Sequence, residues 1–168
     1  MKRKTLVVLA ILSVCFLFFG CAPAGVTTGI EVKGTWLHPS SYGDETWVIS
    51  ENSITYSFGG TQVYSADIDS YSNDSFNASE TGAGEYGYAV IKYTAVDGAG
   101  TGTVGGYNIF RWQNYTGSTS AFTQGYKNVG SDYPNNVNYT ATSSADAISI
   151  ITAADGYFGG WSTGASLQ

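Results

Sequence analysis

The chain has 168 residues, enough for one domain with a single hydrophobic core. It is 43% hydrophobic, 15% aromatic and only 12% charged, which excludes a disordered polar chain and is typical of an all-β protein with many turns. Three of the seven basic residues stand at positions 2–4, so residues 21–168 carry four basic residues against all thirteen acidic ones, a net charge of −9. Such a surface repels phosphate groups, which argues against a nucleic-acid partner.

Residues 1–20 have the pattern of a signal peptide. Lys2-Arg3-Lys4 forms a charged start, and the apolar run from Thr5 to Phe19 follows it with only Ser13 interrupting. The run is shorter than the roughly 20 residues that a lasting transmembrane helix needs. We therefore expect this segment to be removed.

The junction Phe18-Phe19-Gly20-Cys21 resembles the lipobox of bacterial lipoproteins, in which a small residue precedes a cysteine. Gly20 and Cys21 match the pattern, whereas Phe18 and Phe19 replace its usual leucine and small residue. The resemblance implies that the Cys21 thiol takes a diacylglyceryl group, that cleavage occurs before it, and that the new amino terminus is acylated, for instance with palmitate. It also implies the lipid bilayer as a partner, and Ala22 in place of an aspartate favours the outer membrane of the cell envelope.

Cys21 is the only thiol expected in the mature chain, because Cys15 lies within the signal peptide. No internal disulfide can form, and lipid modification removes a thiol that would be a liability in an oxidising compartment. Residues 21–33 are small and weakly patterned, and we interpret them as the lipidated amino terminus and a flexible tether. Residues 34–168 are then a single all-β domain.

From Gly34 onward, short alternating segments separated by turn residues predict a barrel or a sandwich. The expected strands lie at 34–37, 46–50, 53–58, 62–69, 85–94, 107–114 and 120–127. Glu51-Asn52 and Gly59-Gly60 are the expected turns on either side of the third of them. The short connections favour an antiparallel up-and-down meander of about eight strands that closes into a small barrel, with a two-sheet β-sandwich as the alternative.

Residues 144–153 are the only stretch with helical spacing, and we expect one short helix there, against the barrel or across one of its mouths. Ser143 or Ser144 is suited to cap it, Asp146 suits its amino end, and Gly156 is expected to close it. The β-branched isoleucines of this stretch would also suit a strand.

Gly34-Thr35-Trp36 resembles the Gly-x-Trp motif that opens lipocalins and related calycin barrels. The resemblance implies that Trp36 closes the base of the barrel and that an arginine from a late strand packs across its ring. Arg111 is the only arginine after the signal peptide, so Trp36 and Arg111 are the candidate barrel-closing pair. Such a cation–π contact is worth about 0.5–2 kcal/mol.

Aromatic residues recur along the expected strands. They either line a cavity for a ligand or fill the core, and both interpretations stay open because a barrel of this size suits either. The candidate ligand or core aromatics are Trp36, Trp47, Tyr56, Tyr88, Tyr107 and Trp112.

Three further motifs fail their chemical tests. Residues 100–105 match G-x-G-x-x-G, but a strand rather than a helix follows, so no nucleotide site is expected. Asp67, Asp69 and Asp74 lack the spacing of a calcium loop. His38 is the sole histidine, and with Cys21 committed to lipid the chain has no zinc-ligand set. We expect no cofactor, no metal and no catalytic residue.

We therefore expect a non-catalytic, membrane-anchored lipoprotein that serves as a lipocalin-like binding module for a small apolar or aromatic ligand. The alternative is a structural or adhesive envelope protein that contacts glycan or protein through a Tyr/Asn/Thr-rich β surface. The sequence specifies neither the ligand nor the oligomeric state.

Overall fold

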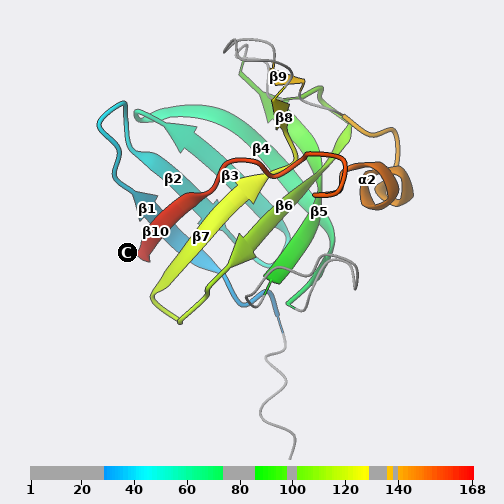
Figure 1. The fold of residues 1–168 in the computed structure, drawn as a ribbon. Coiled ribbons are helices and arrows are strands. Elements are labelled where there is room, and N and C mark those ends of the chain that lie inside the picture. Colours follow the sequence, from blue (N-terminus) through cyan, green and yellow to red (C-terminus); the bar gives the residue numbers. More distant parts are fainter. Residues whose placement is uncertain (1–28, 74–85, 98–101, 129–135, 138–139) are drawn as a thin grey trace, which may run out of the picture.

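The computed structural model describes residues 29–73, 86–97, 102–128, 136–137 and 140–168. These residues form a closed antiparallel barrel of eight strands, with a short helix against its outer wall (Figure 1). The elements are β1 (Gly34–His38), β2 (Glu45–Ile49), β3 (Ser53–Phe58), β4 (Thr61–Ser72), β5 (Tyr86–Val96), β6 (Tyr107–Gln113), β7 (Thr119–Gln124), β8 (Lys127–Asn128), β9 (Asn136–Val137), α2 (Ser144–Ile150) and β10 (Ser162–Leu167). Among the described residues, none of the helices has the length and apolar character needed to span a bilayer.

Strands β1 to β7 pair with their sequence neighbours, and β10 closes the barrel between β7 and β1. The all-β barrel prediction is therefore confirmed over the sandwich. Strand β10 was not among the expected strands, because its sequence STGASL lacks alternating aromatic and polar residues. Ala165 is its only buried residue, so the burial that identifies this strand comes from its neighbours.

Both predicted turns are present. Gly59 and Gly60 join β3 to β4 with φ values of 57° and 80°, the left-handed pair that a type I′ hairpin turn requires. Glu51-Asn52 lies in the β2–β3 turn, where the Ser50 N–H donates to the Ser53 carbonyl at 2.9 Å.

Aromatic rings pack against one another across the barrel interior. Phe122 lies at the centre of this core, with its ring centroid 5.3 Å from Trp36, 5.0 Å from Trp47 and 5.4 Å from Phe110. Phe110 continues to Trp112 at 6.1 Å, and Trp47 stacks on Tyr56 at 5.4 Å. Edge-to-face and offset ring contacts of this kind add to the stabilisation from burial.

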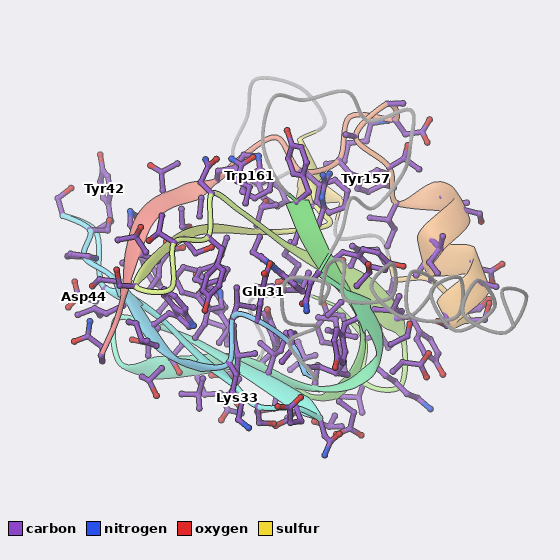
Figure 2. The ribbon with its side chains drawn as sticks, turned by 90° about the horizontal axis from the view of Figure 1, so that it is seen from below. Glu31, Lys33, Tyr42, Asp44, Tyr157 and Trp161 are labelled. Atoms are coloured by element: carbon purple, nitrogen blue, oxygen red, sulfur yellow. The ribbon has the colours of Figure 1, made fainter. Side chains whose placement is uncertain are left out.

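The lower end of the barrel is closed by residues 29–33, which we call the floor segment. Ile30 and Val32 are buried in the aromatic core, and the Trp36 indole N–H donates to the Val32 carbonyl at 2.7 Å. In Figure 2, which views this end, Glu31 lies over the middle of the barrel. The last five residues of the expected tether are thus part of the folded domain. Cys21 and the rest of the tether lie outside the described residues.

Hydrogen bonds fasten the floor segment to the barrel wall. Glu31 accepts from the Trp112 indole N–H at 2.6 Å. The Asn73 amide pairs with the Glu31 N–H at 3.1 Å and with the Gly29 carbonyl at 3.0 Å. Glu51 accepts from the Ile30 N–H at 3.3 Å and from Lys33 Nζ at 3.1 Å. The contact with Lys33 first, and that with Ile30 second, holds the pKa of Glu51 below its ordinary value.

A second core covers the outer wall of β5 and β6. Ala147 and Ile151, from α2 and its carboxyl end, pack with Val90 and Ile109 of these strands. Ser143 caps α2 by accepting from the Asp146 N–H at 3.1 Å, as predicted. The helix lies on the wall rather than across a mouth. It ends at Ile150, before the predicted residue 153, because the chain turns at 152–155 to bring Phe158 into the same core.

The expected pairing of Trp36 with Arg111 is wrong. Arg111 lies between Phe110 and Trp112, which point into the barrel, so its side chain points outward, since neighbouring side chains in a strand alternate in direction. Its guanidinium lies 4.9 Å from the Tyr86 ring, 4.6 Å from Phe158 and 5.8 Å from Trp161. Arg111 therefore holds the segment before β10 against the wall, while the Trp36 indole bonds to the floor segment.

Candidate functional site: the upper rim of the barrel

The end of the barrel opposite the floor segment carries a cluster of polar and aromatic side chains. We call it the upper rim and define it as His38, Tyr42, Asp44, Glu45, Tyr56, Phe58 and Tyr64. Figure 1 shows the β1–β2 loop at this upper end and the first described residues at the lower end. The two ends can therefore be compared directly.

One carboxylate joins three strands of the upper rim. His38 and Glu45 are cross-strand partners in β1 and β2, and His38 Nδ1 lies 2.8 Å from Glu45 Oε2. The Tyr56 hydroxyl of β3 donates to Glu45 Oε1 at 2.9 Å. The side chains of His38 and Glu45 are 24% and 19% exposed, so the group is reachable from solvent.

The polar layer continues inward through two more tyrosines. Tyr64 of β4 faces Tyr56 across the strands, with ring centroids 5.5 Å apart, and meets Tyr93 of β5 edge-on at 5.4 Å. Tyr93 hydrogen-bonds with Gln124 and Asn108. Burial raises the pKa of Tyr64, and the nearby phenols of Tyr93 and Tyr56 raise it further. Three phenol groups therefore lie close together beneath the rim.

The β1–β2 loop adds exposed groups beside this layer. Tyr42 is 90% exposed, and Phe58, opposite Glu45 in β3, is 39% exposed. A side chain at Gly43 would come within 3.1 Å of the Phe58 ring, so the loop lies directly against that ring. Asp44 accepts the Gly59 N–H on its carbonyl at 2.9 Å, which ties the loop to the β3–β4 turn.

The six candidate aromatics do not form one site. Trp36, Trp47 and Trp112 are buried in the interior core, and Tyr56 joins them at the rim. Tyr88 and Tyr107 instead pack on the outer core under α2. Four of the six therefore share the interior, where they contact one another, and two lie on the other side of the wall.

Of the residues in this polar layer, only Tyr56 was among the candidate site residues from the sequence, and His38 was set aside. Their positions relative to the predicted turns could have identified them. A hairpin joining β1 to β2 places His38 opposite Glu45, and the Gly59-Gly60 turn brings Tyr64 opposite Tyr56. The residues set aside as calcium ligands, Asp67 and Asp69, are exposed on β4, and Asp74 lies outside the described residues. In the described part of the chain, the side chains of His, Cys, Asp and Glu form no group of three suited to a metal.

The fold and the rim define a small closed β-barrel that is plugged at one end and carries a polar, aromatic surface at the other. Comparisons of the chain with protein-family models, with curated proteins and with solved structures find no match.

Proposed function

We propose that this protein is a non-catalytic, lipid-anchored binding module of the bacterial cell envelope that recognises its ligand at the upper rim. The proposed attachment to the bilayer is acylated Cys21, with the outer membrane favoured by Ala22. The proposed ligand is a small molecule with an apolar or aromatic part.

The observation that carries this proposal is the difference between the two ends. Cys21 stands eight residues before Gly29, where the described chain enters the floor segment. At about 3.5 Å per residue, that tether reaches at most about 28 Å. An anchor at Cys21 would therefore keep the lower end near the bilayer and turn the upper rim away from it.

The packing of the interior favours binding at the rim over binding deep inside the barrel. A ligand within the barrel would have to displace rings such as Phe122 and Trp47, which are 5.0 Å apart and almost fully buried. At the rim, aromatic surface is exposed by Phe58, the partner of Glu45 in β3, and by Tyr42 in the β1–β2 loop.

Membrane fractionation and site-specific labelling test the anchor and the orientation together. Cys21→Ser is expected to move the protein from the membrane to the soluble fraction. In the lipidated protein, a fluorophore on Tyr42→Cys is expected to be quenched less by spin-labelled lipid headgroups than one on Lys33→Cys at the lower end. Membrane retention of Cys21→Ser contradicts the anchor, and stronger quenching at position 42 contradicts the orientation.

A second candidate function is adhesion to a glycan or protein partner through the outer face of β10 and β1 to β4. Thr35, Val48, Thr55 and Ser65 form one cross-strand row, and Ser166, Leu37, Thr46 and Ser57 form the next. Loss of envelope binding in Val48→Asp, with Tyr42→Ala unaffected, would favour this face over the rim.

A further inference from the structure

The hydrogen-bonding capacity left at the upper rim is mainly that of an acceptor. A carboxylate can accept about four hydrogen bonds. His38 and Tyr56 each contact one oxygen of Glu45, so part of the capacity of this carboxylate to accept hydrogen bonds is left over. A ligand group that donates hydrogen bonds would be better matched here than one that only accepts them.

The Tyr64 hydroxyl is a second and independent sign of a ligand. The Tyr64 side chain is only 1% exposed, yet its hydroxyl makes no hydrogen bond within the described part of the chain. The neighbouring phenols are engaged, Tyr56 with Glu45 and Tyr93 with Gln124. A phenol hydroxyl can accept as well as donate hydrogen bonds, so a donor group that reaches Tyr64 from the rim would find an acceptor there.

The charge distribution also favours a positively charged ligand. All four basic residues after Cys21 are already engaged. Lys33 pairs with Glu51 at the lower end, and the other three lie over aromatic rings, Lys92 on Tyr107, Arg111 on Phe158 and Lys127 on Tyr157. The rim itself carries the carboxylates of Asp44 and Glu45, together with the imidazole of His38 on Glu45. A chain with a net charge of −9 over residues 21–168 adds a field that attracts cations.

From these three observations we infer that the upper rim binds a small organic cation: a protonated amine joined to an apolar or aromatic body. The inference rests on the proposed function and specifies its ligand class. The ammonium group would donate to Glu45 and to the Tyr64 hydroxyl, and the body would lie on Tyr42 and Phe58. Aromatic faces also attract cations, so one surface serves both parts of the ligand.

Three ligands that share one body test this inference. Phenethylammonium, 2-phenylethanol and 3-phenylpropanoate are titrated into the detergent-purified protein by calorimetry at neutral pH. We expect the ammonium compound to bind about tenfold or more tightly than the other two, and its affinity to fall as salt is added. Equal affinities, or tighter binding of the alcohol or the carboxylate, would overturn the inference but leave binding at the rim standing.

Rim variants and matched control variants test where the ligand binds. Tyr64→Phe and Glu45→Gln are expected to weaken phenethylammonium binding, and Glu45→Gln also to remove the preference over the alcohol. Tyr115→Phe and Glu51→Gln repeat the same two substitutions elsewhere, Glu51 at the lower end, and should leave binding unchanged. Unchanged binding in both rim variants, or no binding of phenethylammonium to the folded protein, refutes the amine site. The anchor and orientation are tested separately by fractionation and quenching.

Discussion

The two ends of this barrel are made of the same residue types and do different things with them. At the lower end the tryptophan indoles, Glu31 and the Asn73 amide are paired with the floor segment, so polar groups are used to hold the chain in place. At the upper rim one carboxylate joins His38 and Tyr56 while its side chain is still partly exposed. Polar groups at the lower end are satisfied within the fold, whereas the upper rim keeps spare acceptor capacity, and this is where we propose that a ligand binds.

Trp36→Ala should give the largest effect. It removes a fully buried ring that contacts Phe122 and leaves the Val32 carbonyl without its donor. We expect a loss of about 3–5 kcal/mol in the free energy of unfolding, measured by denaturant titration. Tyr42→Ala at the rim should change it by no more than about 0.5 kcal/mol. Similar losses in both variants would contradict the larger contribution of the lower end to stability.

Glu31→Ala tests whether the floor segment is held by its hydrogen bonds. The substitution strands the indole N–H of the fully buried Trp112, and we expect a loss of about 1–3 kcal/mol in the free energy of unfolding. Glu45→Ala makes the same change at the rim. It should cost under about 1 kcal/mol, because the partly exposed His38 and Tyr56 can bond to water instead. A larger loss from Glu45→Ala would mean that the rim, not the floor, supports the fold.

The smallest expected effect is the pH dependence at the lower end. Lys33 lowers the pKa of Glu51 in the folded state, so Glu51 contributes stability above its ordinary value of 4.5. That contribution is lost as the pH falls through the lowered value. A series of thermal unfolding curves should therefore show a flatter acid decline in Glu51→Gln than in the parent. Lys33→Met should also flatten the acid decline. An unchanged decline in both variants would show that the Glu51–Lys33 contact does not contribute to the pH dependence of stability.

Most strands could be predicted because their signal is local. Alternating aromatic and polar residues identified β1 to β7, the Gly-Gly pair identified a hairpin, and Ser143 with Asp146 identified the start of α2. Strand β10 could not be predicted in this way, because Ala165 is its only buried residue and its pairing with β1 and β7 is non-local. The floor segment had a weak signal that was overlooked, the alternation of apolar and charged residues in Ile30-Glu31-Val32-Lys33.

The sequence by itself determined an all-β chain with its turns and its helix cap, since these depend on residues close together in the chain. Only the tertiary structure decided which face of each strand is inside. Strand β6 is buried on both faces, so its sequence gives no inward or outward direction, and Arg111 was placed beside the wrong ring. Closure of the barrel by β10 decides that direction, and so turns Glu45, Tyr56 and Tyr64, which lie on the adjacent strands β2, β3 and β4, toward one enclosed end.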